Sequence, residues 1–231
     1  MADQTLESNE PVTGREPAAG RERHRPEAAV PAAPLAAALP PATAAFVGRR
    51  AEIGALLAEI DRPGLVRRGT LPPRRSRVLL VAGRPGSGRT ALAVHLAREV
   101  AKRYPDGQFF ARLTQPDGEP VPTARTARLL LRALGVPPPY GADADEPAGI
   151  LRSALADRRA VVVLDDAADS GQVLPLLPDA PGCLVVVVCQ GPLTGVEDAR
   201  PCVLGGLDSA AAIAMITRHT GSTRVTRDPR A

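Results

Sequence analysis

Aromatic residues are scarce in this sequence, which has no Trp, two Tyr and three Phe among 231 residues. Proteins that bind single-stranded nucleic acid stack successive bases on exposed aromatic side chains, so this function is disfavoured. Hydrophobic residues nevertheless make up 44% of the chain. That fraction is enough for one domain whose core is built from Ala, Val, Leu and Ile.

Lysine is also nearly absent, since Lys102 is the only lysine among 29 basic residues. The formal net charge is +4. A modest charge spread along a chain is typical of a solvated surface, so direct DNA binding is not indicated. The densest stretch, 62–84, holds seven arginines and no acid. It is interpreted as a solvated loop leading into a strand, with a binding patch as the alternative.

Only three cysteines are present, Cys183, Cys189 and Cys202, and their spacing fits no metal site. Unpaired thiols are typical of a reducing compartment. The first residues lack a charged segment followed by an apolar run, so no secretory signal is expected. The apolar runs near 161–164 and 184–189 are far too short to cross a membrane. These features predict a cytoplasmic protein without a membrane partner.

Residues 1–42 are rich in Pro, Ala, Glu and Arg and show little periodic hydrophobicity. Such a segment cannot bury enough apolar surface to offset the entropy lost on ordering, so a disordered tail is predicted. At this length the tail is too short for a DNA-binding domain of ordinary size.

From Phe46 onward, segments with helical spacing of apolar residues alternate with short apolar runs. This alternation predicts an α/β fold in which helices cover both faces of a mostly parallel sheet. Strands are expected at 78–82, 108–113, 160–164, 184–189 and 202–204, and helices at 50–60, 90–103, 123–134, 146–156, 170–177 and 209–218.

A glycine-rich segment, Gly83–Thr90 with the sequence GRPGSGRT, joins a predicted strand to a predicted helix. It matches the phosphate-binding pattern G-x-x-x-x-G-K-[ST] except at the lysine. Glycines let backbone N–H groups surround phosphate oxygens, and the helix adds the positive end of its dipole. The hydroxyl of Thr90 is placed to reach a Mg²⁺ ion. The alternative is a glycine-rich turn with no ligand.

Arg89 stands in the lysine position of this pattern. A lysine ammonium is compact, whereas a guanidinium is longer, planar and forked. It still attracts phosphate, so nucleotide binding is expected to survive. The tight positioning that phosphoryl transfer needs is expected to be lost.

The apolar run 161–164 ends in two carboxylates, Asp165 and Asp166. In a nucleotide site, Asp165 would hold Mg²⁺ and its waters, and Asp166 would orient or deprotonate the attacking water. The alternative is an ordinary turn, which aspartate also favours. The phosphate loop about 75 residues upstream favours the functional interpretation.

Several motifs, taken in order, resemble the NB-ARC domain of STAND-class P-loop NTPases, closest to the version in actinobacterial SARP-type regulators. They are Phe46–Arg49, the phosphate loop, 104–110, 117–120, 164–169 and 176–178. The resemblance covers about 43–228. It implies a three-layer P-loop domain at 43–206, followed by the start of a truncated helical subdomain and tail at 207–231.

The resemblance also implies a function: the family's domain holds ADP at rest and exchanges it for ATP on activation. Carried onto this chain, Val47 and Arg49 would lie against the adenine. Asp165 and Thr90 would serve Mg²⁺, and Asp166 would act on the water. The phosphates would be held by Gly83, Gly86, Ser87, Gly88, Arg89 and Thr90.

Gln190 is a second departure from the family, because it stands where an arginine usually senses the γ-phosphate. The family's later lid motifs are also missing from the sequence. These departures predict a regulatory module that binds ADP or ATP with weak or absent hydrolysis and acts through a protein partner or self-association. The alternatives are an active ATPase switch in signalling or transcription and a truncated, non-catalytic remnant of a larger regulator.

Overall fold

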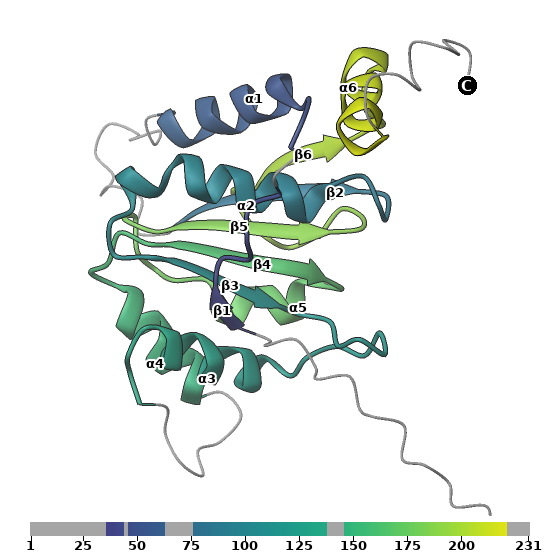
Figure 1. The fold of residues 1–231 in the computed structure, drawn as a ribbon. Coiled ribbons are helices and arrows are strands. Elements are labelled where there is room, and N and C mark those ends of the chain that lie inside the picture. Colours follow the sequence, from purple (N-terminus) through teal and green to yellow (C-terminus); the bar gives the residue numbers. More distant parts are fainter. Residues whose placement is uncertain (1–35, 44–45, 63–75, 138–145, 221–231) are drawn as a thin grey trace, which may run out of the picture. The chain divides into compact units, whose positions relative to one another are not determined.

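The computed structural model describes residues 36–43, 46–62, 76–137 and 146–220. In these ranges the chain forms a six-stranded sheet with the order β1-β3-β4-β5-β2-β6 (Figure 1). The strands are β1 Ala36–Ala38, β2 Arg77–Gly83, β3 Gln108–Arg112, β4 Val161–Ala167, β5 Leu184–Cys189 and β6 Arg200–Leu204. The helices are α1 Arg50–Asp61, α2 Arg89–Glu99, α3 Thr123–Ala133, α4 Glu146–Leu155, α5 Ser170–Val173 and α6 Ser209–Thr220, with 3-10 turns η1 Ala101–Arg103 and η2 Leu174–Leu176.

Strands β3, β4, β5, β2 and β6 run parallel, and β1 is antiparallel to β3. Every residue of β5 is buried, as expected for a strand covered on both faces. The predicted α/β fold with a mostly parallel sheet is therefore confirmed.

Two apolar clusters lie on opposite faces of the sheet and make three layers. Successive residues of a strand point to opposite faces. Leu79 accordingly belongs to the cluster formed with α1 and α2, and Leu80 to the cluster formed with α3 and α4. Figure 1 shows these two helix pairs on either side of the sheet.

Strand β1 lies inside the segment predicted to be a disordered tail, so that prediction was wrong for Ala36–Ala38. The strand pairs with β3 through its backbone, with Ala37 opposite Phe110. A run of alanines carries no alternating pattern, so the sequence gives no strand signal there. The rest of the tail up to residue 35, and the arginine-rich stretch 63–75, lie outside the described residues.

The order of the strands places a crevice at the end of β2. From β2 the chain crosses to β3 on one side, and it later returns through β5 to β6 on the other side. Ligands of open α/β sheets bind beyond the carboxyl ends of the strands at such a reversal of strand order. The glycine-rich loop leaves β2 at this point.

Candidate nucleotide-binding site

The loop from Gly83 to Thr90 forms a tight turn between β2 and α2. Gly86 and Gly88 have φ angles of 78° and 85°, which favour glycine. A Cβ on Gly83 would lie 2.8 Å from the hydroxyl of Ser87 and 3.0 Å from the main-chain oxygen of Leu204. The first glycine therefore lets the loop close against the end of β6.

Two polar atoms of this loop are buried without a hydrogen-bond partner, the hydroxyl of Ser87 and one terminal nitrogen of Arg89. Among the described residues, the only other such side-chain atom is the hydroxyl of Thr126 in α3. Buried polar groups are normally paired, so unpaired ones need an explanation. Their concentration in one loop points to an anionic ligand.

Thr90 of α2 and Asp165 of β4 meet beside the loop, although β5 lies between β4 and the strand β2 that leads into the loop. The hydroxyl of Thr90 donates to Oδ1 of Asp165 across 2.8 Å. Asp165 is 2% exposed, and burial raises the pKa of its carboxyl despite the opposing effects of Thr90 and Arg112. In the described part of the chain no three His, Cys, Asp or Glu side chains cluster around a possible metal position. A hydroxyl and a carboxylate fit Mg²⁺, which keeps several waters and takes other oxygens from phosphates.

Asp166 lies in an irregular part of β4. The pairing of β4 with β5 shifts register between Leu164 and Ala167, and Asp166 has a φ of 59°. Its main-chain oxygen accepts a hydrogen bond from the hydroxyl of Thr114 at 2.7 Å. Bulges of this kind redirect side chains next to active sites. The bulge gives the two neighbouring aspartates different environments, one buried and one partly exposed.

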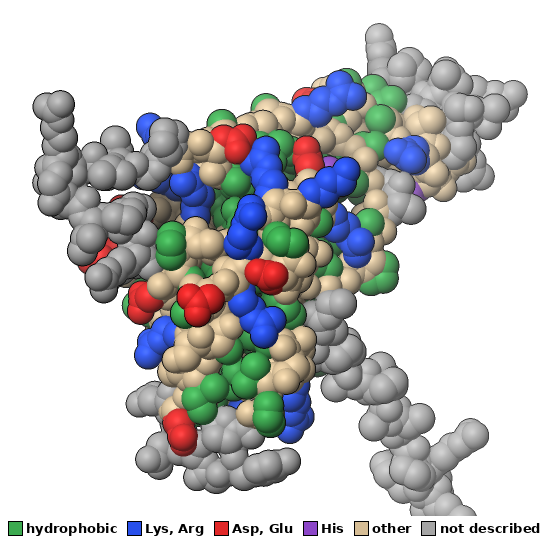
Figure 2. All heavy atoms as spheres, turned by 90° about the vertical axis from the view of Figure 1, so that its left-hand side faces the viewer, with side chains coloured by type: hydrophobic (Ala, Val, Ile, Leu, Met, Phe, Trp, Pro, Cys, Tyr) green, Lys and Arg blue, Asp and Glu red, His purple; other side chains and the backbone are tan. Residues whose placement is uncertain are grey.

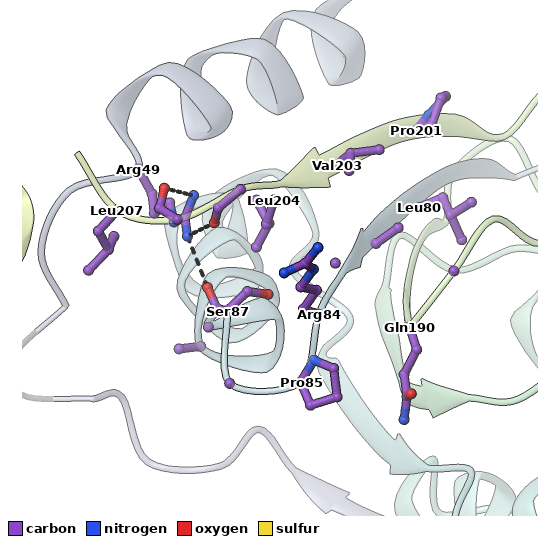
Figure 3. Close-up of a pocket in the computed structure, with 18 of the residues that line it drawn as sticks. Arg49, Leu80, Arg84, Pro85, Ser87, Gln190, Pro201, Val203, Leu204 and Leu207 are labelled. Carbon is purple, nitrogen blue, oxygen red and sulfur yellow. Dashed lines mark hydrogen bonds between the residues drawn. The ribbon is translucent and has the colours of Figure 1, made fainter.

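Arg49 joins three segments around the crevice. Its Nη2 donates to the main-chain oxygens of Gly205 at 2.7 Å and Ser87 at 3.1 Å. Its Nη1 pairs with Oε1 of Glu52 at 2.7 Å and also reaches the main-chain oxygen of Gly206 at 3.4 Å. Figure 3 shows this side chain between the loop and the segment that follows β6.

A mostly apolar cavity of about 940 Å³ opens beside the loop. That volume is within the range of small-molecule sites, roughly 300 to 1,000 Å³. Its walls come from 46–49, the loop, the end of β5 and the segment from β6 to α6. Arg84 and Gln190 are polar side chains in its lining (Figure 3).

The predicted site residues divide into two groups. Six line the cavity: Val47, Arg49, Gly83, Gly86, Ser87 and Gly88. Arg89, Thr90, Asp165 and Asp166 do not line it. Thr90 and Asp165 nevertheless bond to each other, and the positive charge of Arg89 acts on the Asp165 carboxyl.

Other residues of the site escaped the sequence analysis. Leu204 lines the cavity from the end of β6, Leu207 from the segment after it, and Met215 from α6. Phe46 lines it too and stacks on His95 of α2, with ring centroids 4.3 Å apart. The glycine pair 205–206 was an available sign of a close backbone approach.

The face at the other end of the strands carries mixed charge. Figure 2 shows Lys and Arg side chains interspersed with Asp and Glu on it. Glu59 pairs there with Arg62 at 3.1 Å and with Arg200 at 3.6 Å. Such exposed pairs are typical of a solvated surface, as predicted for Arg62. Within the described ranges, no helix has the length and apolar character needed to span a membrane.

The loop and both aspartates lie within a range that matches a known domain model. A model of the AAA domain matches residues 74–177. Regulatory protein AfsR of Streptomyces griseus is 34% identical over 193 residues, covering 82% of this chain and 19% of that protein. AfsR of Streptomyces coelicolor is 34% identical over 155 residues, covering 67% and 16% respectively. The chain thus spans only a small part of the length of these relatives.

Solved structures share the fold at lower identity. A STAND protein with a tetratricopeptide repeat sensor from Pyrococcus horikoshii has a TM-score of 0.51 and 18% identity, covering 80% of this chain and 27% of that one. The ORC2 protein of Aeropyrum pernix in its ADP form has a TM-score of 0.53 and 18% identity, covering 78% and 53%. Taken with the sequence relatives and the geometry of the loop, these likenesses show an AAA-type P-loop NTPase fold, like that of the STAND protein, in a chain related in sequence to part of the AfsR regulatory proteins.

Proposed function

We propose that this chain is a regulatory module that binds ADP or ATP with Mg²⁺ and hydrolyses ATP slowly or not at all. The carrying observation is the pair of buried, unpartnered polar atoms in the phosphate loop, on Ser87 and Arg89. Phosphate oxygens are acceptors that would satisfy both groups. The AAA-type fold and the AfsR relatives support a nucleotide as the source of that phosphate.

The cavity beside the loop is suited to a base and a sugar. Val47 and Phe46 form one wall, and Leu204 and Met215 form others. An adenine ring is flat and largely apolar, so such walls would hold it by contact area. The ORC2 structures are described as an ADP form and as ADPNP–ADP complexes, which favours an adenine nucleotide. Arg49 would contribute by fixing the wall, since its donors bond to protein oxygens and to Glu52.

Thr90 and Asp165 would hold Mg²⁺ together with phosphate oxygens and water. When bound, Mg²⁺ would neutralise charge on the phosphates and bridge them. Asp166, one residue further along β4, would orient or deprotonate an attacking water if turnover occurs.

Two features support slow hydrolysis. Arg89 replaces the compact lysine with a fork that cannot take the same position between phosphates. Gln190, directly after β5, is neutral, so it adds no charge where the γ-phosphate would need stabilisation. The loss of one preorganised cation of this kind typically costs orders of magnitude in rate.

An active ATPase switch is the second candidate, favoured by the intact pair of Thr90 and Asp165. It predicts steady phosphate release that disappears in Asp166→Asn. In both cases a protein partner or a second copy is expected to read the nucleotide state. Exposed apolar residues of β6 and α6, with Val203 at 73% and Ile213 at 52% exposed, support such a contact.

Nucleotide binding is tested by thermal unfolding with ADP, ATP or GDP. Ligand at about 100 times Kd adds about 2.7 kcal/mol of stability, which is several degrees in Tm for a domain of this size. We expect ADP to raise Tm while phosphate release from ATP stays at background. Chromatography of freshly purified, denatured protein should also detect co-purified nucleotide. Folded protein whose Tm responds to neither ADP nor ATP would contradict the proposal and favour a remnant without a ligand.

A further inference from the structure

Arg112, at the end of β3, is the direct cross-strand neighbour of Asp165 on β4. Its Nε lies 3.7 Å from Oδ2 of Asp165. Paired residues on adjacent strands project from the same face of a sheet and interact through their side chains. The β3–β4 register thus directs a fixed positive charge at the carboxylate proposed to serve the metal.

The two oxygens of Asp165 have different partners. Oδ1 accepts from the hydroxyl of Thr90, and Oδ2 faces Arg112. The charge of Arg89 also acts on this carboxyl, and the charge of Asp166 opposes it. Two arginine charges therefore act on one buried carboxylate, that of Arg112 at Oδ2 and that of Arg89.

This arrangement changes what the site needs from a metal ion. A carboxylate beside a phosphate repels it unless a cation lies nearby, and Mg²⁺ ordinarily supplies that cation. Arg112 supplies a positive charge from the protein itself. Its position at Oδ2 also opposes the approach of a divalent cation, because like charges repel. Arg112 is 48% exposed on its side chain, so it can be replaced without opening the core.

We propose that Arg112 is a positioning residue that acts as a built-in counter-cation for Asp165, so that the site binds a nucleoside diphosphate with little dependence on Mg²⁺. This inference rests on the proposed nucleotide-binding function. It distinguishes the chain from a site in which the metal is required to hold the phosphates.

The test compares the Kd of a fluorescent ADP analogue in Mg²⁺ and in EDTA. For the wild type we expect the two values to agree within about threefold, and for Arg112→Gln we expect EDTA to weaken binding about tenfold or more. Arg112→Lys keeps a charge and should stay close to the wild type. Arg152→Gln removes an exposed arginine of α4 and serves as the matched control.

A second measurement reads the metal directly. Titration of Mn²⁺ into the ADP complex, followed by electron paramagnetic resonance, should show binding tighter by about threefold or more in Arg112→Gln than in the wild type. The role of Arg112 would be overturned if the ratio of Kd in EDTA to Kd in Mg²⁺ were equal in the wild type and in Arg112→Gln. It would also be overturned if EDTA already weakened ADP binding tenfold in the wild type. Absence of ADP binding in both buffers would instead overturn the proposed function, and the role of Arg112 with it.

Discussion

The side chain of Arg49 donates a hydrogen bond to the main-chain oxygen of Gly205, 2.7 Å from its Nη2. The same nitrogen reaches the main-chain oxygen of Ser87, so one guanidinium joins the phosphate loop to the segment after β6 (Figure 3). Its other terminal nitrogen pairs with Glu52 of α1. Arg49 is only 8% exposed, and these bonds are made largely out of water. Three distant parts of the chain are therefore held in one wall of the cavity.

Replacing this residue should weaken both the fold and the site. Arg49→Gln would leave Glu52 and the carbonyl of Gly205 without their donors, at a cost of about 2 to 4 kcal/mol. Urea unfolding measures the stability, and titration with ADP should show weaker binding because the wall is released. Arg50→Gln, at the exposed neighbouring position, is the control. A stability equal to the wild type would mean that the bonds of Arg49 add nothing.

Acid should affect the wild type more than Arg49→Gln. The hydrogen bond from Arg49 lowers the pKa of the Glu52 carboxyl, so this pair contributes stability above pH 4.5, the ordinary value, and loses it as the pH falls further. In Arg49→Gln this contribution is already absent. The difference in unfolding free energy between the two proteins should therefore shrink as the pH falls from 6 to about 3. Parallel curves across this range would contradict the linkage.

Asp165 should show the opposite sign. Burial raises the pKa of its carboxyl, so the charged form costs stability at neutral pH, and this cost disappears as the pH falls through the folded-state pKa. Asp165→Asn should therefore increase the free energy of unfolding at pH 7.5 by about 1 kcal/mol, which is measured as a higher Tm. The increase should be smaller at acidic pH. Asp157→Asn, on the surface after α4, is the control, and a Tm below the wild type would contradict this balance.

The sequence was sufficient for the framework because its signals are local. Apolar runs such as β5 predict buried strands, and a glycine pattern between strand and helix predicts the loop. The relationship between Arg49 and Gly205 could not be predicted in this way, since 156 residues separate them. The pairing of Arg112 with Asp165 depends on the register of two strands, which no local pattern encodes.

Other features were hidden for a different reason. The residues Ala36–Ala38 join the sheet through backbone bonds, so their side chains give no signal. The left-handed backbone of Asp166 lies at the bulge between β4 and β5. The sequence cannot show this, because an aspartate in an ordinary turn gives the same local pattern. Both depend on neighbouring strands that are distant in sequence.

Arg89→Lys should restore part of the family's chemistry. A lysine ammonium is compact enough to lie between two phosphates, whereas one terminal nitrogen of Arg89 is buried without a partner. We expect ADP to bind more tightly, or phosphate release to rise, by about tenfold. Arg152→Lys, at an exposed arginine of α4 away from the cavity, is the matched control. If neither affinity nor turnover changes, the loop does not hold phosphate.

Gly83→Ala tests the tightness of the loop itself. The new methyl group would lie 2.8 Å from the hydroxyl of Ser87 and 3.0 Å from the main-chain oxygen of Leu204, so the loop or the end of β6 must move. We expect ADP binding to weaken by about tenfold or more, because the phosphate donors would leave their preorganised positions. Gly54→Ala in α1 is the control, since its methyl group meets nothing within 4 Å and a helical glycine gains about 0.5 to 1 kcal/mol from this change. Normal ADP binding by Gly83→Ala would show that the phosphates do not depend on this closure, and that the loop takes a different shape around its ligand.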